Sequence, residues 1–191
     1  DWPNLPKPVS LPFVQDDWEA HINKYFSGYD WHYKSQRRKH VRRAVSEEKA
    51  LFKKKNSARI SVLGFSNGGH AALYFAHRLM TEGIPLEFGF TADPVWRPGH
   101  YVPLRKPENV GRWENYFQRT DEGSLKGIPI KGRPVRDADV NNELTQLGPD
   151  GHVLITLNVQ SQLVNAFVDA GVPVKTENED SLVFARNRKR N

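Results

Sequence analysis

The stretch that decides the fold runs from Ile60 to Leu79 and reads ISVLGFSNGGHAALYFAHRL. Residues 58–65 form a run of β-branched and aliphatic side chains that ends in a glycine and a phenylalanine, which indicates a buried strand. The residues after the two glycines carry apolar side chains at helical spacing, which indicates a helix. Ser66 therefore lies in a sharp turn between a strand and a helix.

The turn around Ser66 fits the pattern G-x-S-x-G, in which a serine between a strand and a helix is a nucleophile. Side chains two residues away on either side would collide with neighbouring backbone, which explains Gly64 and Gly68, and Gly69 adds further room. The start of the helix offers amide groups to a developing oxyanion, and we expect the N–H of Asn67 to be the first donor. The alternative is that Ser66 is an ordinary helix N-cap.

A second apolar run, PLEFGFTADPV at residues 85–95, follows the predicted helix. Strand, helix and strand in close succession form the unit of a parallel sheet. The carboxyl ends of parallel strands meet at the same edge, so Asp93 is expected near Ser66, with Pro94 keeping it extended. The alternative is an Asp-Pro turn with a solvated carboxylate.

A serine hydroxyl becomes a nucleophile only when a base accepts its proton. We therefore look for an acid and then a histidine that follow Ser66 in the chain. Of the seven histidines, three precede Ser66 and two lie on the predicted helix, where geometry turns them aside. His152 follows the turn GPDG and begins the last amphipathic segment, which favours it as the base. His100 follows Asp93 closely in a proline-rich loop, and we interpret His100 and Trp96 as substrate or lid contacts.

The remaining segments predict a basic helix, a long loop and a last helix. Residues 34–55 hold ten Lys or Arg beside a narrow apolar stripe, so one helix face is either solvated or bound to an anionic surface. Residues 96–150 are rich in Pro, Gly, Arg and Asn, and we expect a long excursion over the edge of the sheet, with short strand candidates at 114–119 and 123–132. Residues 152–171 carry helical periodicity up to a final glycine.

The 191 residues fit one domain, with an N-terminal arm and helical region at 1–57 and a catalytic core at 58–191. The chain has no cysteine, which excludes a disulfide framework, a thiolate zinc site and a cysteine nucleophile. No spacing of His, Asp and Glu matches a metal motif and no phosphate-binding fingerprint occurs, so we predict neither metal nor cofactor.

Charge and hydropathy restrict partners and location. The formal charge of +6 favours an anionic partner. No apolar run is long enough to span a membrane and the first residues lack a signal-peptide layout, so we expect a soluble protein, either cytoplasmic or a secreted effector.

Four segments together resemble a small bacterial α/β hydrolase of the lipase or esterase type: GFSNGGHAA (64–72), TADPVW (91–96), PENVGRWENYFQ (107–118) and VNNELTQLGPDGHVLI (140–155). The resemblance covers residues 59–170. It implies that Ser66 is the nucleophile, Asp93 the orienting acid and His152 the general base. It also implies a substrate that is an ester or thioester of a lipid-like acyl group, as in relatives that are antibacterial lipase effectors.

One departure from that family concerns the residues ahead of the serine. The fold normally places a strand, and a loop with the second oxyanion donor, before the nucleophile strand, yet residues 1–57 contain no clear strand. Either an unusual loop around Gly28 supplies the donor, or an N-terminal segment or a partner chain completes the site.

Two further functions compete with hydrolysis. The basic helix and the tail RNRKRN suit a nucleic-acid-binding module, although the aromatic residues are not interleaved with the basic runs as a stacking platform requires. The chain is alternatively a noncatalytic module that binds an anionic partner. In an enzyme, the same basic helix would hold the protein on an anionic membrane.

Overall fold

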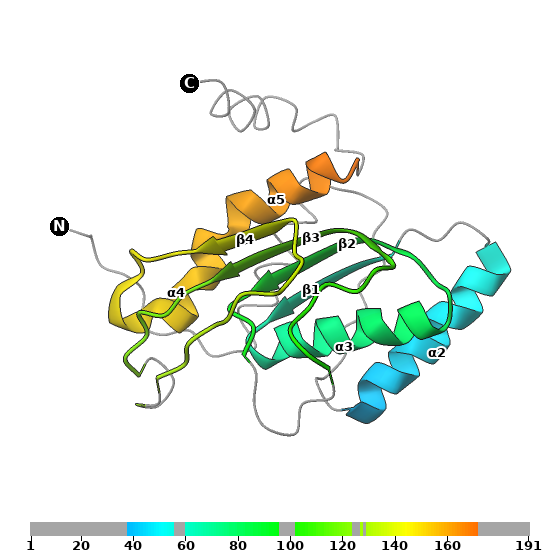
Figure 1. The fold of residues 1–191 in the computed structure, drawn as a ribbon, viewed down its shortest axis with the longest axis horizontal. Helices are drawn as coiled ribbons and strands as arrows, with labels where there is room; N and C mark the ends of the chain where they lie inside the picture. The colour runs from blue at the N-terminus through cyan, green and yellow to red at the C-terminus, as the bar shows by residue number, and fades with distance from the viewer. Residues whose placement is uncertain (1–37, 56–59, 96–101, 124–126, 128, 172–191) are drawn as a thin grey trace. The chain divides into compact units, whose positions relative to one another are not determined.

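The structure is a computed structural model, and it describes residues 38–55, 60–95, 102–123, 127 and 129–171 (Figure 1). The chain divides into two compact units, one of residues 33–155 and one of residues 1–32 together with 156–191. The first unit holds the sheet and every described site residue. No helix in the described ranges combines the length and apolar character that a membrane crossing requires.

The first unit is built on a four-stranded sheet in which all strands run parallel (Figure 1). The expected α/β class with a parallel sheet and flanking helices is therefore present. The strands follow each other in chain order: β1 (Ser61–Phe65), β2 (Leu86–Ala92), β3 (Val110–Phe117) and β4 (Val140–Glu143).

The register aligns the carboxyl ends of the first three strands. Phe65 at the end of β1 pairs with Ala92 at the end of β2, and Ala92 pairs with Tyr116 near the end of β3. The next residues along β1 and β2 are Ser66 and Asp93, so the parallel register brings the predicted nucleophile and acid to one edge, as expected.

Helix α3 (Asn67–Thr81) connects β1 to β2 and packs on both strands. Its buried stripe, which includes Leu73 and Leu79, forms one core cluster with Trp113 of β3. Gly89 of β2 makes room for that ring, because a Cβ atom there would lie 2.2 Å from a ring carbon of Trp113. The indole Nε1–H donates to Thr91 Oγ1 at 3.0 Å, which satisfies its buried donor.

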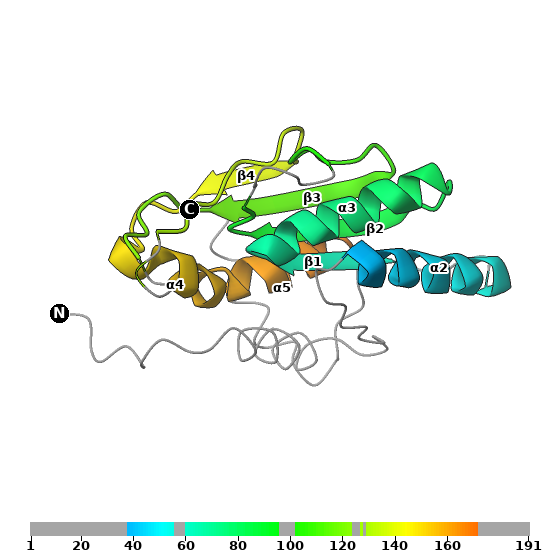
Figure 2. The same ribbon diagram turned by 90° about the horizontal axis from the view of Figure 1, so that it is seen from below.

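Helix α2 (Arg38–Lys55) confirms the predicted basic helix over its described part and packs against α3 (Figure 2). Val41, Ala44 and Val45 are buried, while Leu51 of the expected apolar stripe is 36% exposed. The lysines and arginines of the opposite face remain exposed, including Arg42 and Arg43.

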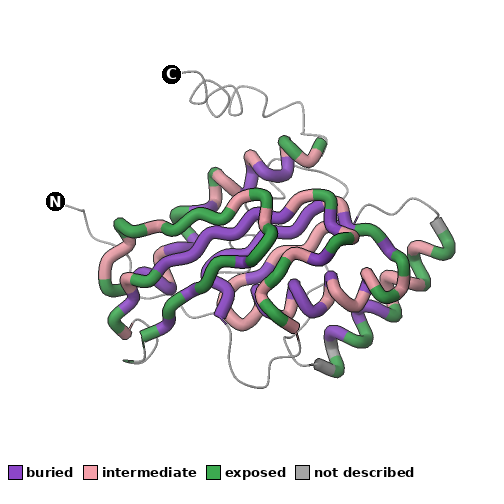
Figure 3. The backbone as a smooth tube through the Cα atoms, in the orientation of Figure 1, coloured by how far each residue is buried: buried purple, intermediate pink, exposed green. Residues whose placement is uncertain are grey.

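The expectation of one long excursion at residues 96–150 is wrong, because this segment supplies half of the sheet. Strand β3 pairs along β2 and is largely buried (Figure 3). The strand candidate at 114–119 overlaps the second half of β3 and is confirmed there, while the first half was not predicted. Polar residues of this strand are satisfied by tertiary partners: Asn115 accepts from Thr91 Oγ1 at 2.8 Å. The described part of 123–132 forms no strand.

The predicted last helix is divided in two. Helix α4 (Gly151–Asn158) follows a short 3-10 turn (Gly148–Asp150), and helix α5 (Gln160–Asp169) begins after a break at Val159. The residues through Ile155 belong to the unit of the sheet, and α5 belongs to the other unit. The N-terminal arm at 1–37 lies outside the described residues.

Candidate active site

Ser66 has the backbone conformation of a strained turn, with φ 57° and ψ −126°. A residue with a side chain rarely adopts a positive φ, and such strain persists only where surrounding bonds impose it. Here the Ser66 N–H donates to Ala92 O at 3.0 Å, and Ser66 O accepts from the N–H groups of Gly69 at 3.0 Å and Val95 at 3.3 Å. Its side chain makes no capping hydrogen bond to α3, so the N-cap alternative lacks its defining contact.

The glycines around Ser66 differ in how much the turn depends on them. A Cβ atom on Gly64 would lie 2.4 Å from Gly68 O, and one on Gly69 would lie 2.8 Å from the Cβ of Pro94. At Gly68, no described atom lies within 4 Å of the added carbon. The steric argument therefore holds for Gly64 and Gly69, while for Gly68 it is wrong because that position opens away from the sheet.

Asp93 is fully buried at the end of β2, which excludes the alternative of a solvated carboxylate. The expectation that Pro94 keeps Asp93 extended is wrong, because its φ is 49°, in the left-handed region of a sharp turn. One oxygen, Oδ1, accepts from the main-chain N–H of Gln118 at 2.9 Å. The other, Oδ2, accepts from Gln118 Nε2 at 2.7 Å and lies 2.5 Å from His152 Nδ1. These contacts hold the buried carboxylate in one orientation.

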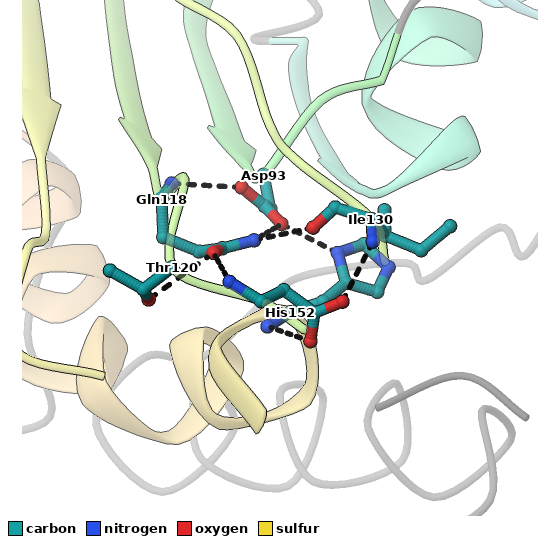
Figure 4. A network of polar contacts seen from close by, with 6 residues as sticks. Asp93, Gln118, Thr120, Ile130 and His152 are labelled. Carbon is teal, nitrogen blue, oxygen red and sulfur yellow. Dashed lines mark hydrogen bonds and ion pairs between the residues drawn. The ribbon is translucent and has the colours of Figure 1, made fainter. Parts of the chain in front are cut away.

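His152 lies in the first turn of α4 and is fully buried (Figure 4). An ionised carboxylate only accepts hydrogen bonds, so the contact with Asp93 assigns the imidazole proton to Nδ1. In the neutral ring Nε2 then carries the lone pair, and this nitrogen is buried without a hydrogen-bond partner among the described residues. The ring of Phe65, next to Ser66, stacks on the imidazole with ring centres 4.8 Å apart.

Gln118 and Asp121 complete a closed ring of hydrogen bonds around this pair, and Figure 4 shows Gln118 beside Asp93 and His152. Gln118 Oε1 accepts from the Asp121 N–H at 2.8 Å, and Asp121 Oδ1 accepts from the His152 N–H at 3.3 Å. Both residues are buried and both follow β3. The sequence analysis missed them. Their signal was a polar residue directly after the end of β3 and a carboxylate three residues later, at the edge where Asp93 lies.

Residues 130–133 pack directly against this site. Gln118 Nε2 also donates to Ile130 O at 2.8 Å, and the Ile130 N–H donates to Asp121 Oδ2 at 2.7 Å. Gly132 passes so near that an added Cβ would lie 1.8 Å from Asp93 Oδ1. Any larger residue would displace the segment or the carboxylate, so Gly132 is a further residue that the sequence analysis missed.

The predicted site residues are thus brought together in part. Asp93 and His152 are hydrogen-bonded, and Ser66 follows the neighbouring strand, but Nε2 of His152 is not bonded to Ser66 Oγ. Asn67 opens α3, as an oxyanion donor requires, and its side-chain Oδ1 is buried without a described partner. His70 contacts Val102 O at 3.0 Å instead of the serine, as its place on the helix predicted.

Gly28, Trp96 and His100 lie outside the described residues. Within the described ranges, no cluster of three or more His, Cys, Asp or Glu side chains is arranged to hold a metal ion.

The arrangement supplies a carboxylate, an oriented imidazole with a free lone pair and a strained serine at one sheet edge, which are the groups that general-base activation of a hydroxyl requires. No protein-family model matches the sequence, and a search of curated proteins finds no match.

Proposed function

We propose that the protein is a serine hydrolase of the α/β-hydrolase type that cleaves a carboxylic ester through Ser66, Asp93 and His152. The observation that carries the proposal is the 2.5 Å contact between Asp93 and His152, which leaves Nε2 as the only free nitrogen of the ring. The positive φ of Ser66 at the end of the adjacent strand supports it, because nucleophilic serines occupy this kind of turn.

In the proposed reaction, Ser66 Oγ attacks the ester carbonyl while His152 Nε2 accepts its proton. The carboxylate of Asp93 stabilises the imidazolium that forms, and the N–H of Asn67 donates to the oxyanion. His152 then donates the proton to the leaving alcohol, which leaves an acyl group on Ser66. Water, activated by the same imidazole, releases the acid and restores the serine.

The Ser66 to His152 hydrogen bond has to form when the substrate binds. Hydrogen bonds between catalytic groups are often long or absent without substrate and tighten in the complex. The main-chain bonds of Ser66 keep its turn in place, so the adjustment required lies in the side chains. The lipid-like nature of the acyl group rests on the family resemblance of the four segments.

Labelling with a fluorophosphonate probe tests the proposal, since the probe phosphonylates only an activated serine. Wild type is expected to be labelled, and Ser66→Ala is expected to remain unlabelled with an unchanged circular dichroism spectrum. Ser46→Ala is the matched control, because Ser46 lies on α2 and donates only to Arg42 O. A folded wild type without label, or equal labelling of Ser66→Ala, would refute the proposed chemistry.

The exposed basic face of α2 supports a second function for the same chain, which is contact with an anionic membrane surface. Val41 and Val45 on one side of the helix are buried, so the basic side chains on its other side are exposed to solvent. Sedimentation with vesicles of rising phosphatidylglycerol content measures this contact, which salt should weaken. Equal binding to neutral vesicles would contradict it, and salt-sensitive binding to DNA or RNA would favour the nucleic-acid alternative.

A further inference from the structure

A basic groove adjoins the buried Asp93. It has a volume of about 690 Å³ and is partly open to solvent. Its described lining contains three cationic side chains, two prolines and no acidic residue: Pro103, Leu104, Arg119, Lys131, Gly132, Arg133 and Pro134. Neither the sequence patterns nor the proposed catalytic steps use this groove.

The wall of the groove is the same segment that covers the catalytic acid. Gly132 lines the groove and also passes against Asp93 Oδ1. The Arg133 N–H donates to Pro94 O at 3.0 Å. Val95, which follows Pro94 in the chain, donates its N–H to Ser66 O. A molecule in the groove is therefore separated from the turn of Ser66 by one short stretch of β2's exit loop.

The cations of the groove are available for a ligand. Lys131 and Arg133 are exposed, and none of the described acidic side chains pairs with either. Among the described acidic residues, Arg119 contacts only Glu143, at a long 3.8 Å, and it lies over the ring of Phe117.

Nearby basic residues outside the groove are neutralised instead. Arg105 pairs with Asp137 at 2.6 Å, and Lys106 pairs with Asp139 at 2.7 Å. Among the described residues of this region, unpaired positive charge is thus concentrated in the groove, and Arg136 is an exposed cation outside it that also has no acidic partner there. Like charges that share a groove repel each other, and an anion between them relieves that repulsion.

We propose that this groove binds an anionic group, a phosphate or a carboxylate, that the ester substrate carries beside its scissile bond. The proposal rests on the proposed hydrolase function and narrows its substrate class to negatively charged esters. Arginine supplies a planar pair of donors that fits the oxygens of either group, and lysine adds a point charge. The leucine and prolines of the wall provide an apolar surface for the neighbouring carbons of the substrate.

Two soluble esters of equal acyl length test the proposal without a membrane. Dihexanoylphosphatidic acid carries a phosphate and dihexanoylglycerol does not, and both are assayed below their aggregation concentrations. The measured quantity is the ratio of kcat/KM for the two esters. Wild type is expected to favour the anionic ester, and Lys131→Gln/Arg133→Gln is expected to lower the ratio about tenfold or more, mainly through KM.

Arg136→Gln is the matched control, because Arg136 is exposed on the same segment and does not line the groove. Its ratio should equal that of wild type. A wild-type ratio near one, or an unchanged ratio in the double variant, would overturn the proposal. So would an equal fall of the ratio in Arg136→Gln, because that result would assign the preference to general surface charge.

A binding measurement separates failure of this inference from failure of the proposed function. Calorimetric titration with inorganic phosphate and with succinate should show binding to wild type that the double variant loses, and the stronger of the two identifies the anionic group. Serine labelling without anion binding or preference would refute the groove alone. Anion binding without serine labelling would refute the hydrolase and, with it, the assignment of the anion to a substrate.

Discussion

The imidazole Nδ1 of His152 lies 2.5 Å from Oδ2 of Asp93, and both side chains are completely buried. The two residues are 59 positions apart in the chain, yet each is held by the same polar ring through Gln118 and Asp121. This pair determines which nitrogen of the histidine faces the serine edge, and the first prediction follows from it.

Replacement of Asp93 by asparagine should lower the rate of fluorophosphonate labelling by a factor of about 10⁴. An amide can present a hydrogen to Nδ1, which moves the ring proton to Nε2 and removes the lone pair that accepts the serine proton. The labelling rate at a temperature well below the melting point measures the effect. Asp150→Asn, at an exposed position two residues before His152, should label at the wild-type rate, and an equal loss there would contradict the assignment.

Ser66→Gly should be more stable than Ser66→Ala by about 1 kcal/mol, although neither variant is labelled. The alanine keeps a Cβ atom at φ 57°, whereas glycine adopts that angle without strain. The free energy of unfolding from urea titration gives the comparison. If the alanine variant is equally stable, the turn of Ser66 stores no strain.

Gln118→Met should reduce both stability and labelling. The substitution keeps the volume but removes one of the three donors to Asp93 and the acceptor for the Asp121 N–H. We expect the free energy of unfolding to fall by about 2 to 3 kcal/mol. Labelling of the folded variant should slow about tenfold or more, because Asp93 is no longer held in position beside the imidazole.

Thr120→Val is the control for Gln118, because the threonine hydroxyl makes only a 3.4 Å contact to the same amide. It should change labelling little. A Gln118 variant that is destabilised but labels at the wild-type rate when folded would show that the residue supports the fold and does not position the pair.

Gly64→Ala should unfold the turn of the nucleophile, whereas Gly68→Ala should be tolerated. The new methyl at residue 64 would lie 2.4 Å from the main-chain oxygen of residue 68, and the methyl at residue 68 meets no described atom. We expect a loss of 2 kcal/mol or more for the first substitution, from overpacking against backbone, and less than about 0.5 kcal/mol for the second. The melting temperatures of the two variants measure the difference. Equal losses in both variants would contradict the steric argument.

Asp139→Asn should destabilise the protein at neutral pH and have little effect in acid. Although partial burial alone would raise the pKa of Asp139, hydrogen bonds from Lys106 and from the Trp113 N–H hold the pKa below its usual value. A lowered pKa in the folded state means that the carboxylate stabilises the fold above its unfolded pKa and that this stabilisation is lost as the pH falls through the folded pKa.

We expect the Asp139→Asn difference in the free energy of unfolding to be about 1 kcal/mol at pH 7, because solvent screens the exposed part of the carboxylate. The difference should disappear toward pH 2, and urea titrations across this range measure it. A difference that stays constant with pH would assign the effect to packing and not to charge.

The sequence by itself determined the elements that depend on local pattern. The β1–α3–β2 unit was predictable because apolar periodicity and glycine positions act over a few residues, and the strand ends then placed Asp93 near Ser66. Chain order left His100 and His152, and the place of His152 at the start of the last amphipathic segment favoured it; its contact with Asp93 agrees with that choice.

Only the tertiary structure decided the remainder of the sheet and the surroundings of the pair. Strand β3 was predicted only in part because Asn115 finds its partners on the neighbouring strands, at Thr91 and Asn141, where local pattern does not register them. Gln118, Asp121 and Gly132 act through residues 25 to 39 positions away, as their contacts with Asp93 and His152 show. Burial of a polar group is favourable only when distant segments supply its hydrogen bonds, and that pairing becomes visible only when the chain is folded.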